Sequence, residues 1–306
     1  MISRETLSIS GPHGLEVDIP FFEIDGSEDG PHLTVLAGVH GAEYSSIAAA
    51  KKFVREIDVT LVRGRITVVP IVNILGFWAR TAFIVPADGK NLNRSFPGDS
   101  SGTFSEVLAD RVFKKFIEDS DFLVDMHAGD IPESLTPFTV FEESIVEDKS
   151  LALAKAYGIK DIVRQKMSGM VVTGSTTAAA AAIGIPAVTV ESGHNGILDP
   201  RAVEIHCLGI TNLARSVGVL SGTPWPERPH QLYDGWDWLR SDREGWWSPL
   251  CETGAEVHAG QVVGTMSDLW GDVYAQVTAP NDGTILFQTS SPAVSAGGIL
   301  VGLAIR

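Results

Sequence analysis

Cysteine is scarce in this chain, whose 306 residues include only Cys207 and Cys251. The two lie far apart and form no Cys-x-x-Cys pair, which argues against a disulfide framework and against a zinc site made of thiolates. Long apolar runs are missing too, since no segment approaches the roughly 20 apolar residues that span a bilayer. The first residues contain no apolar core of a signal peptide. We therefore expect a cytoplasmic protein with no membrane partner.

Positive charge is also in short supply. The chain has 23 Lys and Arg residues against 38 Asp and Glu residues, which gives a formal net charge of -15. Such a surface repels phosphate backbones and anionic lipid headgroups. We therefore expect no nucleic acid partner, and a cytoplasmic enzyme is the default expectation.

Four short apolar runs dominate the first part of the chain. Continuous Val, Ile and Leu runs of this length fit buried strands of a parallel sheet. Between them, Glu43 to Ile57 and Thr103 to Asp119 carry apolar residues at helical spacing. This alternation predicts an α/β fold with a mostly parallel sheet. The predicted strands are Leu33–Val39, Ile66–Val72, Phe122–Val124 and Ile185–Val190.

The composition of the chain changes near residue 221. Ser221 to Pro229 contains three prolines, which favour a linker over residues 221–230. After it the segments shorten and glycine becomes frequent, which predicts a small all-β domain over residues 231–306. The residues before it, 1–220, form the predicted first and larger domain.

The predicted β domain resembles the biotinyl and lipoyl carrier fold from Glu252 onward. A carrier domain needs a lysine to modify, but the last lysine of the chain is Lys166. We therefore expect a structural role for this domain. Four tryptophans near its start are expected to pack the two domains together; they are Trp236, Trp238, Trp246 and Trp247.

Polar residues follow each of the four predicted strands. In open α/β sheets the ligand binds outside the carboxyl ends of the strands, so these residues are expected to meet in one crevice. They are His40 and Glu43 after the first strand, Asn73 after the second, Asp125 and His127 after the third, and Glu191 after the fourth.

Three of these residues suit a zinc ion. Catalytic zinc usually has three protein ligands and keeps a fourth position open. His40 and Glu43 lie three residues apart, and we expect Gly41 to permit the sharp bend between them. His127 supplies a third ligand, and Asp125, on the same face of its strand, is placed to orient its imidazole. The alternative is that both histidines are inert, hydrogen-bonded residues at strand ends.

Two further groups complete the predicted site. Glu191, at the end of a buried strand, is the candidate general base for a water whose pKa the metal lowers. The alternative for Glu191 is a structural ion pair with an arginine. Arg94 offers a planar guanidinium suited to a substrate carboxylate, and Asn93 can hydrogen-bond the same group. The alternative for Arg94 is an arginine that closes a loop against surface acids.

Taken in order, four motifs of the chain resemble the succinylglutamate desuccinylase/aspartoacylase family, which belongs to the zinc carboxypeptidase fold group. The resemblance covers about the first 220 residues. It implies one zinc ion on His40, Glu43 and His127, Glu191 as the base, and Asn93 with Arg94 on the substrate carboxylate. It also implies a three-layer α/β/α domain around a mixed sheet. The motifs are His-Gly-Ala-Glu at 40–43, Asn-Leu-Asn-Arg at 91–94, Asp-Met-His at 125–127 and Glu-Ser-Gly at 191–193.

One motif departs from the family pattern. Aspartoacylases tend to have Asn-Pro-Arg after the second strand, whereas this chain has Asn73-Ile74-Leu75. Arg80 is the nearest substitute for the missing arginine, so we include it as a substrate-binding candidate. In overall look the chain is nearest to the bacterial deacetylases of N-acetyl-diaminobutyrate.

The predicted reaction is zinc-dependent hydrolysis of the amide bond of a small N-acyl amino acid. A zinc carboxypeptidase acting on peptides, or an ester hydrolase using the same site, is the alternative. A β domain that closes the crevice favours the small substrate. Gly174-Ser175-Thr176-Thr177 resembles a helix cap more than a serine nucleophile. The sequence leaves a homo-oligomer open.

Overall fold

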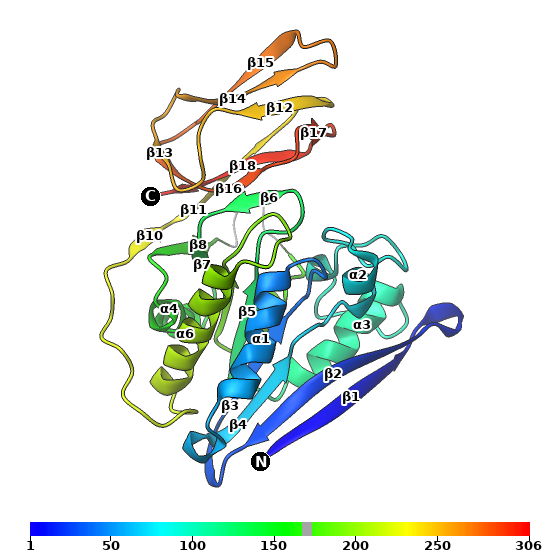
Figure 1. Ribbon diagram of the computed structural model, residues 1–306, viewed down its shortest axis with the longest axis vertical. Helices are drawn as coiled ribbons and strands as arrows, with labels where there is room; N and C mark the ends of the chain where they lie inside the picture. The colour runs from blue at the N-terminus through cyan, green and yellow to red at the C-terminus, as the bar shows by residue number, and fades with distance from the viewer. Residues whose placement is uncertain (167–172) are drawn as a thin grey trace.

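A mixed sheet forms the centre of the protein in the computed structural model, which describes residues 1–166 and 173–306 (Figure 1). Its nine described strands have the order β1-β2-β4-β3-β5-β9-β7-β8-β10. Strands β4, β3, β5 and β9 run parallel, while β7, β8 and β10 run parallel to one another and antiparallel to β9. The strands are β1 Ile2–Ser10, β2 Glu16–Asp25, β3 Glu28–Ala37, β4 Arg63–Val69, β5 Phe122–His127, β7 Phe138–Glu142, β8 Asp161–Gln165, β9 Ala187–Glu191 and β10 Gln231–Tyr233.

Helices bury apolar residues against both faces of this sheet. One core cluster joins the sheet to α1, α4 and α6, and a second joins its other face to α3 and α5. Because the central strands are covered on both sides, their apolar runs are continuous instead of alternating. The helices are α1 Tyr44–Glu56, α2 Ile74–Ala79, α3 Phe104–Val112, α4 Glu147–Tyr157, α5 Thr176–Ala182 and α6 Pro200–Ser216, with shorter turns at Pro12–Gly14, Val59–Leu61, Leu92–Arg94 and Phe113–Ile117.

The mostly parallel sheet was predicted correctly, and so were the main helices. The predicted helix over Thr103–Asp119 is α3 continued by a π-helical turn at Phe113–Ile117. The expected cap at Ser175 is present, because its hydroxyl accepts a hydrogen bond from the N–H of Ala178 at 3.0 Å. Among the described residues, no helix combines the length and the apolar character that a membrane crossing requires.

A C-terminal antiparallel β region lies at one end of the molecule, at the far end from the N-terminus (Figure 1). Its strands form two sheets, ordered β11-β18-β16-β13 and β15-β14-β12-β17. The resemblance of this region to carrier domains stays a prediction. The strands are β11 Gly235–Arg240, β12 Gly245–Pro249, β13 Glu256–Val257, β14 Val262–Ser267, β15 Val273–Thr278, β16 Gly283–Thr289, β17 Ala293–Val294 and β18 Ile299–Ile305.

Two strand pairings join the large sheet to the C-terminal β region. β6 (Glu133–Leu135) comes from the first part of the chain but pairs with β16. β10 (Gln231–Tyr233) follows the expected linker but pairs with β8. The division into 1–220, 221–230 and 231–306 stays a prediction, and these two exchanges tie its parts together. A small apolar cluster seals the junction, formed by Leu135, Phe138, Val163, Tyr233, Leu286 and Ala304.

The four tryptophans do not act as one set. Trp247 is buried in the core of the β region itself, and Trp246 is half exposed, so the expectation that they join the two domains is wrong for both. Trp236 does contact the large sheet, because its ring meets the edge of Phe138 at 5.3 Å between centroids. It also stacks on Trp238 at 4.9 Å.

Residues 231–306 supply β16, which pairs with β6, and β10, which pairs with β8. We therefore expect a chain ending at residue 230 to be much less stable than the full chain. Its junction cluster would be exposed to water, and buried apolar area contributes roughly 25 cal/mol per Å². Thermal unfolding and size-exclusion chromatography of the two chains test this. A truncated chain that stays monomeric and unfolds at the full-length temperature would contradict it.

Candidate metal centre and active site

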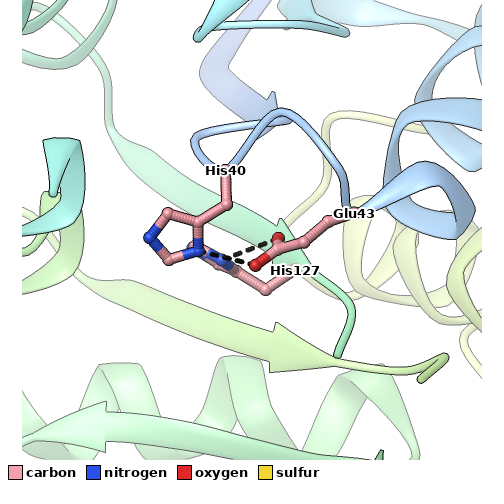
Figure 2. A group of neighbouring side chains, drawn as sticks. All are labelled: His40, Glu43 and His127. Carbon is pink, nitrogen blue, oxygen red and sulfur yellow. Dashed lines mark hydrogen bonds and ion pairs between the residues drawn. The ribbon is translucent and has the colours of Figure 1, made fainter. Parts of the chain in front are cut away.

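Three buried side chains meet where β3 and β5 end, and Figure 2 shows them pointing toward one another. The Nδ1 atom of His40 lies 2.6 Å from Oε1 of Glu43, and the Nδ1 atom of His127 lies 3.0 Å from Oε2 of the same carboxylate. One donor atom from each residue lies within 4.8 Å of the others. This spacing and the His-Glu-His donor set fit a divalent cation such as zinc.

Two glycines shape the segment that leads from β3 through His40 to Glu43, but not in the way the sequence suggested. Gly38, which precedes His40, is the left-handed residue, at φ 62°. Gly41 is needed for close approach instead, because a Cβ there would lie 2.1 Å from the backbone nitrogen of Phe77 in α2. Glu43 then occupies the N-cap position of α1, which fixes where its side chain starts.

Each imidazole is oriented by a hydrogen bond on its outer nitrogen. His127 places Nε2 3.0 Å from Oδ2 of Asp125, and the Thr176 hydroxyl donates to the same carboxylate oxygen. His40 places Nε2 3.1 Å from the side-chain oxygen of Asn91. The inner Nδ1 atoms of both rings are thereby directed toward Glu43.

Charge is concentrated at this centre. Burial alone would raise the pKa of Glu43, but the neighbouring imidazoles His127 and His40 hold that pKa at about 2. Burial alone would lower the pKa of His127, but the charges of Asp125 and Glu43 raise it well above its usual value. The pocket of donors therefore stabilises positive charge, as a cation site must.

Glu191 lies beside this centre because β9 pairs with β5 in a register that sets it opposite His127. Its Oε2 atom is buried and has no hydrogen-bond partner among the described residues. Burial raises the pKa of its carboxyl well above the usual range. A structural ion pair with an arginine is absent from the described part of the chain, so that alternative loses its basis.

Arg94 and Asn93 line the same cavity as the three donors. Asn93 is buried and accepts a hydrogen bond from the N–H of Thr176 at 3.2 Å. The guanidinium of Arg94 donates to the carbonyl of Asn93 at 2.6 Å. No carboxylate of residues 1–166 or 173–306 forms an ion pair with Arg94, so it does not close a loop against surface acids. Desolvation within the cavity lowers its pKa, and the nearby charges of Glu133 and Glu142 oppose that change.

The cavity has a volume of about 740 Å³ and is walled on one side by the C-terminal β region. Figure 1 shows that region above the end of the large sheet where β5 finishes. A β domain closing the crevice was expected, but none of the residues that form this wall was predicted to line the site. Its lining residues from the β region include Trp236, Trp238, Arg240, Phe287, Thr289 and Ser295.

Two predicted site residues lie outside the cavity lining. Arg80 ends α2 in the left-handed conformation and is exposed, because the helix finishes on the outer surface before the chain turns back. Asn73 caps the start of α2 by accepting from the N–H of Gly76 at 2.8 Å. Its amide is committed to that helix and is not available to a metal.

A sequence pattern typical of serine hydrolases also lies outside the cavity lining. Residues Gly98-Asp99-Ser100-Ser101-Gly102 match the Gly-x-Ser-x-Gly pattern of serine hydrolases. The match is accidental, because Ser100 is exposed, precedes α3 in a turn that follows no strand, and lies outside the cavity lining.

His206, on α6, is a residue that sequence reasoning missed. It is fully buried, and its Nε2–H faces the carbonyls of His127 at 3.0 Å and Ser192 at 3.2 Å. Its Nδ1 atom accepts a hydrogen bond from the hydroxyl of Tyr157 at 2.9 Å. Burial lowers the pKa of His206 to about 4, so the ring is neutral. It joins the ends of β5 and β9, where His127 and Glu191 lie.

This chain is similar to known proteins of one family. The catalytic-domain profile of the succinylglutamate desuccinylase/aspartoacylase family matches residues 29–217. The N-alpha-acetyl-L-2,4-diaminobutyric acid deacetylase of Halomonas elongata is 29% identical over 288 residues, covering 90% of this chain and 82% of that protein. The product-bound ectoine utilization protein of Ruegeria pomeroyi has a TM-score of 0.89 at 23% identity, covering 100% of this chain and 95% of that one.

A further solved structure, the succinylglutamate desuccinylase/aspartoacylase of Rhodobacter sphaeroides, has a TM-score of 0.84 at 25% identity, covering 98% of this chain and 94% of that one. The chain belongs to the succinylglutamate desuccinylase/aspartoacylase family. It is accordingly an amidohydrolase of the deacylase class.

Because His206 satisfies two buried carbonyls, we expect His206→Ala to destabilise the fold by roughly 1–3 kcal/mol, the usual cost of leaving such groups unpaired. Urea unfolding of the variant tests this. His258→Ala is the matched control, because His258 is exposed on the β region and its loss should have almost no effect. Equal stabilities of the two variants would rule out this role.

Proposed function

We propose that the protein hydrolyses the amide bond of a small N-acyl amino acid in a metal-dependent reaction. The observation that carries this proposal is the group His40, Glu43 and His127 at one end of a cavity whose wall also holds an arginine without an ion-pair partner among the described residues. The Halomonas relative supports the substrate class, because its name describes an N-acetylated diamino acid.

The three donors would hold one zinc ion, with the Nδ1 atoms of both histidines and the carboxylate of Glu43 as ligands. When bound, such an ion polarises a carbonyl and lowers the pKa of water. Asp125 and Asn91 keep the two imidazoles in the orientation that the site requires. No other described group of His, Cys, Asp and Glu residues offers a comparable set.

Glu191 is proposed as the general base. Its free, buried Oε2 atom can take a proton from the attacking water and return it to the leaving nitrogen. The raised pKa makes the carboxylate a stronger base than an exposed glutamate. Arg94 and Asn93 are proposed to hold the substrate carboxylate, which positions the acyl amide near Glu191.

A carboxypeptidase acting on peptides would use the same groups. We favour the smaller substrate because residues of β11, β16 and β18 wall the cavity on one side, and because the Halomonas relative is named for a small N-acetylated diamino acid. An ester of the same size would fit equally well. Released amine or alcohol should therefore be assayed with a panel of N-acetyl, N-succinyl and N-formyl amino acids, an ester analogue and a short peptide.

The metal proposal gives a direct prediction. The purified protein should contain about one zinc ion per chain. His127→Ala should lose both the ion and the activity, because two ligands hold zinc poorly. Elemental analysis and the amine assay measure the two effects. A metal-free preparation with full activity would end this proposal.

A second prediction separates the base from the substrate clamp. Glu191→Gln keeps the shape of the side chain but accepts no proton, so kcat should fall by roughly 10²–10⁴-fold while zinc content and fold survive. Arg94→Ala should raise KM at least as much as it lowers kcat, because it removes a binding contact. Steady-state kinetics, metal content and melting temperature of both variants provide the test. Wild-type kcat in Glu191→Gln, or loss of its zinc, would remove Glu191 from this role.

A further inference from the structure

A second carboxylate in the cavity has no role in the proposed reaction. Glu142 ends β7 and lines the cavity, yet its side chain is only 6% exposed. Its Oε1 atom accepts a hydrogen bond from the hydroxyl of Thr177 at 3.2 Å. Within the described ranges, Glu142 forms no ion pair, because no lysine, arginine or histidine nitrogen lies within 4.0 Å of its carboxylate.

This arrangement is unusual on physical grounds. A buried carboxylate normally has a cation beside it, because a charge removed from water is costly without a partner. Neutral hydroxyl groups do not replace that partner. Burial raises the pKa of Glu142 to about 7, so near neutral pH an arriving cation would find the carboxylate ready to ionise.

The surroundings of Glu142 also favour a cation. Arg94 lies near enough for its charge to lower the pKa of Glu142, yet the two form no ion pair. The cavity therefore holds a cationic and an anionic group with space between them. The stacked pair Trp236 and Trp238 lines the same cavity, and aromatic faces attract ammonium groups.

We propose that Glu142 binds a side-chain ammonium group of the substrate, so that the substrate class is N-acyl diamino acids. Arg94 takes the carboxylate, Glu142 takes the free ammonium, and the acyl amide lies at His40, Glu43 and His127. This inference rests on the proposed function and specifies which amino acids it accepts. Glu142 is then a specificity-determining residue that the reacting amide does not touch.

The experiment compares two substrates that differ only at the charged group. Nα-acetyl-2,4-diaminobutyrate carries the ammonium, and Nα-acetyl-norvaline has a methyl group in its place. The wild-type enzyme should have a kcat/KM at least tenfold higher for the first substrate, because a hydrogen bond to a charged group is strong. Most of the difference should lie in KM.

Glu142→Gln removes the charge and keeps the shape. It should lower kcat/KM for the diamino substrate by roughly tenfold or more and lower that for the norvaline substrate far less, so that the preference between the two is lost. Glu142→Asp keeps the charge and should restore part of the preference. Glu143→Gln is the matched control, because the adjacent Glu143 lies 2.9 Å from Arg164 and outside the cavity lining, so both substrates should behave as in the wild type.

The outcomes distinguish a failure of the proposed function from a failure of the ammonium site at Glu142. If the wild-type enzyme hydrolyses neither substrate nor any other N-acyl amino acid, the proposed function fails. If it hydrolyses both substrates equally well, or if Glu142→Gln slows both by the same factor at unchanged melting temperature, the ammonium site is wrong while the proposed function stands.

Discussion

The Glu43 carboxylate, shared between two imidazoles, is the interaction on which the rest of the site depends. Its two oxygens face His40 and His127 at 2.6 and 3.0 Å, and the second oxygen also accepts the N–H of Ala128 at 3.2 Å. A carboxylate this deeply buried requires positive charge around it. The order of the sheet meets that requirement, because β3 and β5 are neighbours and end at the same edge.

Sequence reasoning predicted that His40, Glu43 and His127 lie together because they stand at the ends of uninterrupted apolar strands. The carboxyl ends of parallel strands converge, so residues distant in the chain can be placed together from the sequence pattern alone. The same rule fails for Asn73, because the short helix α2 begins at Ile74, soon after β4 ends at Val69. Asn73 caps that helix, and Arg80 leaves it on the outer surface. Gly41 was predicted to permit the bend. Glycine is required there for another reason, because a side chain would clash with the backbone of α2.

The rest of the cavity could not be read from motifs because it depends on tertiary closure. The pairing of β6 with β16 and of β10 with β8 brings the C-terminal β region over the end of the large sheet. Trp238 and Arg240 thereby join residues more than a hundred positions earlier in the chain. The missing lysine argued against a carrier role and the β domain was expected to close the crevice, but no sequence pattern revealed which of its side chains face the candidate active site.

The most direct test of the central claim is a titration of metal-stripped protein with zinc while amine release from an N-acetyl amino acid is followed. The account predicts almost no activity in the stripped protein, a linear increase as zinc is added, and a plateau at about one equivalent per chain. Full activity before any metal is added, or no activity at any zinc level across the N-acyl amino acid panel, would contradict it.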